Sequence, residues 1–155
     1  MAASPTFQAQ DPNFAERIRD SFNRQGVMDY IGATMVDVRP GYVEIHLPHK
    51  PQLAQQHGFF HAGMIGTIAD SAGGYAAYTL MPADASVLTV EYKLNLLRPA
   101  DGDLLIARAH VIKAGRTLTV CRADVDAVKN GESKLCATMQ LTLMTMHGMS
   151  DNPQV

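Results

Sequence analysis

Asp70 is the residue whose type and setting in this sequence most strongly suggest chemistry. It lies in a segment, residues 61–80, that is rich in Gly and Ala, and it is the only acidic or basic residue past the first turn of that segment. A helix over this segment would be about 30 Å long at 1.5 Å per residue. A lone carboxylate in such apolar surroundings is poorly solvated, and poorly solvated carboxylates are candidate catalytic groups.

The residues expected to share a helical face with Asp70 are small. At about 100° per residue, the segment has one face that can pack on a sheet and an opposite face that carries Asp70. The first face comprises His61, Ile65, Ile68, Ala72, Tyr75, Ala76 and Thr79, and the second comprises Gly63, Gly66, Thr67, Asp70, Gly74 and Ala77. Because a solvated face would carry Lys, Glu or Arg, we expect a second subunit or a thin ligand to approach here. The alternative is a loosely built helix or a loop, because each Gly in a helix interior lowers helix stability by about 1 kcal/mol relative to Ala.

The composition excludes some classes of function. The chain has 155 residues and a net charge of −2, which gives no indication of a nucleic-acid or anionic-membrane partner. The sequence shows neither a signal-peptide pattern nor a stretch of about 18 uninterrupted apolar residues, so we expect no membrane segment. These features predict a cytoplasmic protein with one domain over residues 1–155. Residues 1–11 and 147–155 are expected to be loose tails.

The two cysteines are expected to be unpaired. Asn130-Gly131 predicts a tight hairpin turn. The register of that hairpin would place Cys121 opposite Gln140 and Cys136 opposite Val125, so the thiols would not face each other. Two small, unpaired strand residues indicate a reducing compartment.

Hydrophobic periodicity and turn residues give the order of the elements. They predict a helix from Pro12 or Asn13 to Gln25, strands over 34–38 and 42–47, a loop over 48–60, the helix over 61–80, and strands over 88–96, 103–113, 117–128 and 133–146. We expect the last four strands to form a meander. The order predicts an α+β fold, in which an antiparallel sheet wraps around the long apolar helix.

The strand over 88–96 alternates between apolar and polar residues. Leu88, Val90, Tyr92, Leu94 and Leu96 are predicted to share one face, and Thr89 is predicted to lie on the opposite, polar face.

Residues 55–70 resemble the signature of the hotdog-fold acyl-CoA thioesterases of the PaaI-like (phenylacetic acid degradation) family. In that family an HGG triplet opens the central helix, and a catalytic Asp or Glu follows nine residues after its His. Here His61-Ala62-Gly63 is the triplet and Asp70 has that spacing. Gln55 stands where the family usually has Asn. The resemblance implies the hotdog fold, an antiparallel sheet around a central helix.

Two later features also match the family. Thr89 lies ten residues before Pro99, and Gly115-Arg116 follows the next strand. The resemblance extends over residues 28–146. It implies a homo-oligomer, either a dimer or a dimer of dimers (a homotetramer), whose active site lies at the subunit interface.

The resemblance also implies roles for individual residues. The N–H of Ala62, with Gly63 beside it, would stabilise negative charge on the thioester oxygen. Asp70 would act as general base on water or as nucleophile, and the sequence leaves both open. Thr89 would orient the water, and Gln55 would hold the water or the carbonyl. His61 is expected to fix the start of the helix by hydrogen bonding rather than to act as a base.

Four further residues are expected to bind substrate. Arg98, Lys113 and Arg116 are candidate contacts for the phosphates of CoA, with solvated turn charges as the alternative. His57 lies in the loop that leads to the helix start, where binding residues are common. We expect no metal, because the Glu of an HExxH site is absent. We expect no cofactor either, because the CoA moiety belongs to the substrate.

The sequence therefore predicts an acyl-CoA thioesterase that acts on an aromatic or medium-chain acyl-CoA without a metal. Two alternatives remain open. One is a non-catalytic acyl-CoA-binding or sensing protein with the same fold. The other is an enoyl-CoA hydratase or dehydratase relative, which would use a His in proton transfer.

Overall fold

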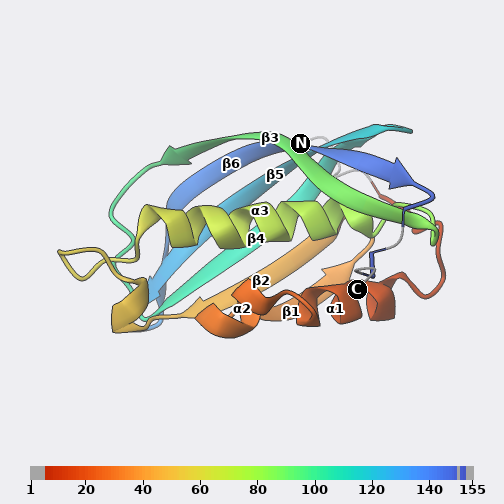
Figure 1. The fold of residues 1–155 in the computed structure, drawn as a ribbon. Coiled ribbons are helices and arrows are strands. Elements are labelled where there is room, and N and C mark those ends of the chain that lie inside the picture. Colours follow the sequence, from red (N-terminus) through yellow and green to blue (C-terminus); the bar gives the residue numbers. More distant parts are fainter. Residues whose placement is uncertain (1–5, 150, 153–155) are drawn as a thin grey trace.

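In this computed structural model, which describes residues 6–149 and 151–152, the described chain forms a six-stranded antiparallel sheet curved around one long helix (Figure 1). The elements are α1 (Phe14–Asn23), α2 (Gly26–Ile31), β1 (Thr34–Arg39), β2 (Tyr42–Pro48), the 3₁₀ turn η1 (Pro51–Leu53), α3 (Ala62–Tyr78), β3 (Ala85–Leu96), β4 (Leu104–Ala114), β5 (Leu118–Lys129) and β6 (Glu132–His147). The predicted α+β hotdog architecture is confirmed. No helix in the described residues is long and apolar enough to cross a membrane.

The helix α3 packs along the concave face of the sheet, and the core lies between the two. Of the residues predicted to face the sheet, all except His61 are buried. His61 is exposed because it caps the helix from outside. Gly73 allows the close approach, since a Cβ there would lie 2.5 Å from a methyl group of Leu141.

The strand order is β1-β2-β4-β5-β6-β3, so the predicted four-strand meander is wrong. Only β4, β5 and β6 form a meander; β3 pairs with β6 at one edge, and β4 pairs with β2. Burial gives the physical reason. The inward residues of β4, among them Leu105, Ala107 and Ala109, are fully buried at the centre of the sheet. Most of β3 is exposed on both faces and therefore suits an edge.

A β-bulge at Val90 overturns the predicted faces of β3. Thr89 pairs with Leu143 and Tyr92 with Leu141, so one extra residue lies between them. Leu143 and Leu141 are both buried under α3. Because directly paired residues point to the same face, Thr89 and Tyr92 both face α3. Without the extra residue, the strict alternation that the sequence predicts would turn Thr89 outward.

The N-terminal region contains two helices where the sequence predicted one. Gln25 is extended (φ −74°, ψ 104°) and separates α1 from α2, so Gly26 begins the second helix rather than ending the first. Gly32 (φ +82°) ends α2 in the left-handed conformation that favours glycine. Both helices lie along the side of the molecule that carries β1 (Figure 1).

The expectation of loose tails is not met at residues 6–11 or at His147. Phe7 packs against the core, Gln10 donates a hydrogen bond to Leu80 O (2.8 Å), and Asp11 is only 7% exposed. His147 belongs to β6. Residues 1–5, 150 and 153–155 of the two predicted tails lie outside the described residues.

Cys121 and Cys136 are both free and buried. The predicted register is wrong by one residue, because Cys121 pairs with Leu141 and Val125 with Ala137. Cys136 is the extra residue at a register shift. Burial raises the pKa of Cys121 to about 12 and that of Cys136 to about 11, so neither thiol is reactive at neutral pH.

Candidate active site

Asp70 lies in the middle of α3 and is half-buried beside β3. Thr89 Oγ1 donates a hydrogen bond of 2.7 Å to its Oδ1. Burial raises the pKa of Asp70 above its ordinary value, and the hydrogen bond from Thr89 offsets part of this rise because it stabilises the ionised form. The carboxylate is therefore a stronger base than a solvated Asp, and it is oriented by a neighbour.

Two hollows meet at Asp70. One, of about 130 Å³, lies between α1, α3 and β3, and the other, of about 610 Å³, lies between α2, α3 and β3. Gln25, Asp70 and Ser71 line both hollows. The larger hollow continues along the helix to Ala62 and Gly63. A substrate in this groove would pass Asp70 and could extend to either side of it.

The start of α3 offers one free amide donor. His61 Nδ1 accepts a hydrogen bond from the N–H of Gly63 (2.9 Å), which caps the helix. This bond occupies the Gly63 N–H that the sequence suggested as a second donor. The N–H of Ala62 has no acceptor among the described residues. A ring nitrogen that accepts a bond carries no proton, so this geometry agrees with the capping role expected for His61.

The amide of Ala62 and the carboxylate of Asp70 are far apart within one chain. They are eight positions apart in α3, which is about 12 Å along a helix at 1.5 Å per residue. A carbonyl oxygen about 3 Å from an N–H donor and a carbonyl carbon about 3 Å from the attacking group cannot span this distance. One chain alone therefore does not bring the two groups to one thioester.

Gln55 and His57 lie in the loop before α3. Gln55 Oε1 accepts a hydrogen bond from the backbone N–H of His57, and a bridge between Ala54 and Phe60 closes the loop. Neither side chain lines the hollows at Asp70. The structure thus shows Gln55 bonded within its own loop rather than to Thr89 or Asp70.

The three cations predicted to contact phosphates do not converge in one chain. Arg98 lies near the start of α3. Two residues after it, the oxygen of Ala100 accepts a hydrogen bond from the N–H of Phe60, which directly precedes the helix cap His61. Lys113 and Arg116 are exposed at the other end of the sheet. Arg98 shares a hollow of about 350 Å³ with Lys129 and Lys134, which the sequence analysis had not singled out.

Sequence reasoning also missed four residues that line the groove. Gln25 comes from the turn between α1 and α2, and Ser71 follows Asp70 on α3. Tyr92 and Leu94 reach the groove from β3. No motif marks these residues, and only the packing of α2 and β3 beside α3 brings them to Asp70.

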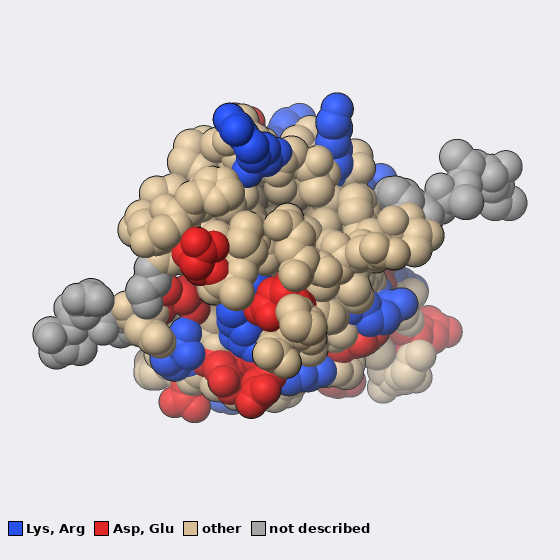
Figure 2. All heavy atoms as spheres, turned by 90° about the vertical axis from the view of Figure 1, so that its right-hand side faces the viewer, with Lys and Arg blue, Asp and Glu red and all other residues tan. Residues whose placement is uncertain are grey.

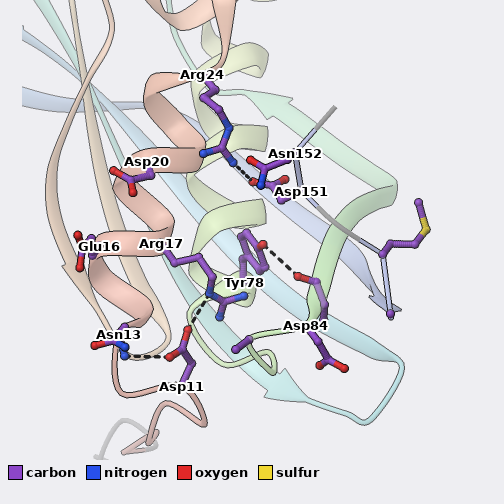
Figure 3. Close-up of a pocket in the computed structure, with 14 residues that line it drawn as sticks. Asp11, Asn13, Glu16, Arg17, Asp20, Arg24, Tyr78, Asp84, Asp151 and Asn152 are labelled. Carbon is purple, nitrogen blue, oxygen red and sulfur yellow. Dashed lines mark hydrogen bonds and ion pairs between the residues drawn. The ribbon is translucent and has the colours of Figure 1, made fainter. Parts of the chain in front are cut away.

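Another hollow, of about 660 Å³, lies at the far end of α3, between α1 and the residues around Asp84 and Asp151 (Figure 3). Asp151 lines both this hollow and the smaller one at Asp70. Five carboxylates and two guanidinium groups line it. Arg17 is bound to Asp11 (2.9 Å) and Arg24 to Asp151 (2.7 Å). Figure 2 shows acidic and basic side chains intermingled over the lower part of this end of the molecule. An excess of carboxylates with paired cations disfavours an anionic ligand such as CoA.

Metal ligation finds no support in the described part of the chain, where no three His, Cys, Asp or Glu side chains are grouped to hold an ion.

Comparisons with known proteins agree on one family. A sequence model of the thioesterase superfamily matches residues 57–134. A protein of Halobacterium salinarum, provisionally named an esterase, is 32% identical over 124 residues, 77% of this chain and 80% of its own length. The 1,4-dihydroxy-2-naphthoyl-CoA hydrolase of Listeria monocytogenes is 25% identical over 72% of this chain and 89% of its own.

A solved structure agrees as well. The crystal structure of a thioesterase family protein from Silicibacter pomeroyi is 50% identical, with a TM-score of 0.86 over 87% of this chain and 99% of that one.

Proposed function

The chain belongs to the thioesterase superfamily, and we propose that it hydrolyses an aromatic or medium-chain acyl-CoA to the free acid and CoA, with Asp70 as the catalytic carboxylate. The observation that carries this proposal is the half-buried carboxylate of Asp70, held by Thr89 at the junction of two hollows. The raised pKa of Asp70 supports a role in proton transfer. The Listeria relative, named for a naphthoyl-CoA, supports an aromatic acyl group.

The proposed chemistry needs no metal. Asp70 either takes a proton from water, whose oxygen then attacks the thioester carbon, or attacks that carbon itself. The carbonyl oxygen gains negative charge and is stabilised by the N–H of Ala62 at the positive end of α3. The C–S bond then breaks and CoA leaves as the thiolate, which takes the proton from Asp70 in the first route and a proton from solvent in the second. In the second route, water hydrolyses the resulting anhydride and restores Asp70.

We propose that the site forms between two copies of the chain. The separation of about 12 Å along α3 between Ala62 and Asp70 supports a site in which one copy supplies the amide and the other the carboxylate. The edge strand β3 supports this assembly, because Leu88, Val90 and Tyr92 are 53–55% exposed along it. A long apolar edge strand presents unpaired backbone groups that can pair with another chain. Pairing along β3 would bring the two α3 helices together.

The two buried, unpaired cysteines support a reducing compartment, and we expect the protein to act in the cytoplasm. We propose that Arg98 contacts the phosphates of CoA, with Lys113 and Arg116 of either copy as further contacts. Lys129 and Lys134 lie in the same hollow as Arg98 but are paired with Asp101 (2.7 Å) and Glu132 (3.6 Å). We propose that His57 and Gln55 contact the substrate from the loop before α3.

Release of free thiol from a panel of acyl-CoA esters tests the hydrolysis. We expect turnover by the wild type and a loss of at least about 100-fold in Asp70→Asn, the size expected for a catalytic acid–base group. Asp84→Asn, which changes an exposed acid outside the groove, is the matched control and should keep full activity. Tight binding without turnover would identify an acyl-CoA-binding protein instead. Addition of water to an enoyl-CoA would identify a hydratase.

A further inference from the structure

The smaller hollow beside Asp70 ends at Gly74, a glycine whose side of the helix is open. Gly74 lies one turn after Asp70 on α3, and both residues line the hollow of about 130 Å³. A Cβ added at Gly74 would meet no atom within 4 Å. By contrast, a Cβ at Gly73 would lie 2.5 Å from Leu141. Packing in the described chain therefore explains Gly73 but leaves Gly74 without a structural reason.

Gly74 also has a cost. Glycine in a helix interior is less favourable than alanine because it loses more backbone entropy on folding. Since alanine would fit here without a clash, the sequence gives up stability in order to keep this space empty. Such a trade is typical of functional sites.

The other sides of this hollow are fixed by hydrogen bonds. Gln25 Nε2 donates to Tyr75 Oη at 3.0 Å, and Tyr75 Oη lies 3.0 Å from Ser21 Oγ. Tyr75 and Ser21 are 4% and 6% exposed, so these bonds join α1 and α3 within the core. Val87 closes the side toward β3. Asp151, whose carboxylate is paired with Arg24 at 2.7 Å, lines the remaining side. The hydrogen bonds therefore hold the α1 and α3 sides of the hollow in place.

We propose that this hollow is the acyl subsite and that Gly74 sets the size of the acyl group that it accepts. This inference rests on the proposed hydrolysis at Asp70. With the thioester carbon at Asp70, the larger hollow takes the pantetheine arm and the smaller one takes the acyl group. An apolar cavity of about 150 Å³ holds one benzene, so a hollow of about 130 Å³ has room for about one aromatic ring, which would lie against Gly74, Val87 and the ring of Tyr75.

The test compares benzoyl-CoA with acetyl-CoA in the wild type, Gly74→Ala and Gly74→Leu. Acetyl is too short to fill the hollow and reports on the chemistry alone. We expect the ratio of kcat/KM for benzoyl-CoA to that for acetyl-CoA to fall several-fold in Gly74→Ala and at least tenfold in Gly74→Leu. The Tm of Gly74→Ala should equal or exceed that of the wild type.

Gly66→Ala is the matched control. Gly66 lies on the same helix but lines the larger hollow, and its added Cβ would make an ordinary contact with Leu94 (3.7 Å). We expect the benzoyl-to-acetyl ratio to remain that of the wild type in this variant, whatever its overall rate. An equal fall of the ratio in Gly66→Ala and Gly74→Ala would overturn the assignment of the hollow.

Binding measurements separate the subsite from the hydrolysis. These measurements use proteins that carry Asp70→Asn. Calorimetry should show that adding Gly74→Leu lowers the affinity for benzoyl-CoA at least tenfold and leaves the affinity for free CoA unchanged. If no protein releases thiol but this selective weakening occurs, the proposed hydrolysis is wrong and the subsite stands. An unchanged ratio of kcat/KM in an active Gly74→Leu protein, or no selective weakening, would overturn the subsite.

Discussion

Thr89 Oγ1 donates a 2.7 Å hydrogen bond to Asp70 Oδ1, and this bond depends on one extra residue in β3. Val90 forms a bulge that turns Thr89 toward α3, although strict alternation would point it outward. The bulge therefore places a hydroxyl donor on the carboxylate. Because a donor stabilises the ionised form, Thr89 tunes the proton affinity of Asp70.

Thr89→Val should shift the pH dependence of the reaction. Removing the hydroxyl removes a bond to the ionised form, so the pKa of Asp70 rises further above its ordinary value. As the pH falls, the carboxylate of the variant is then protonated, and activity lost, at a higher pH than in the wild type. We expect the acid limb of kcat/KM to move to higher pH in Thr89→Val and to stay in place in Thr89→Ser. If the acid limb of kcat/KM lies at the same pH in the wild type, Thr89→Val and Thr89→Ser, Asp70 is not the titrating group.

Much of the fold follows from hydrophobic patterning. The long apolar helix, its sheet-facing side and the strands after it were predicted close to their observed bounds. The turn at 130–131 also formed as predicted, with Lys129 paired to Glu132. These features depend on local residues, whose preferences agree with the tertiary packing.

Features set by long-range packing were not predictable. The edge position of β3 depends on competition with β4 for the centre of the sheet. The bulges at Val90 and Cys136 shift the register by one residue, and neither has a local sequence signature. Gln25 reaches the groove from the turn between α1 and α2, where its Nε2 donates a hydrogen bond to Tyr75 Oη on α3. The family resemblance assigned Thr89 and Asp70 to one site, but neither the resemblance nor the periodicity predicted the hydrogen bond between them.

His61 is expected to act through the helix start. Its Nδ1 caps the N–H of Gly63, so His61→Ala should lower stability by about 1 kcal/mol, as other lost caps do. The same change should reduce turnover by loosening the amide of Ala62. His61→Asn, which supplies a favourable capping residue, should restore both the Tm and most of the activity. Failure of Asn to restore activity, with a normal Tm, would indicate that the imidazole itself takes part in the reaction.

The two edge strands provide a matched test of assembly. Val90 in β3 and Val36 in β1 are each the extra residue of a bulge, and they are 55% and 49% exposed. Val90→Glu should dissociate the oligomer and abolish turnover, because a buried unpaired charge at an interface is costly. Val36→Glu should change neither property. Sedimentation velocity measures the assembly, and dissociation by both variants or by neither would contradict pairing through β3.

The amide of Ala62 can be removed without losing the helix. Ala62 is the first residue of α3, where proline is well tolerated, and His61 already has the extended conformation (φ −63°, ψ 139°) that a following proline requires. Ala62→Pro should therefore fold normally and lose about 10²- to 10³-fold in kcat, as expected for one lost oxyanion donor. Circular dichroism and Tm verify the fold. Full activity of Ala62→Pro would show that the N–H of Ala62 is not the oxyanion donor.

Mixing Ala62→Pro with Asp70→Asn subunits tests most directly whether the site is shared between two copies. Each variant alone should be nearly inactive. After equal amounts are unfolded together and refolded, half of the dimers are mixed and each mixed dimer has one intact site, so the thiol-release rate should recover to about a quarter of the wild-type rate. A mixture that stays as inactive as its components would contradict the account, because it would place both groups of each site on a single chain.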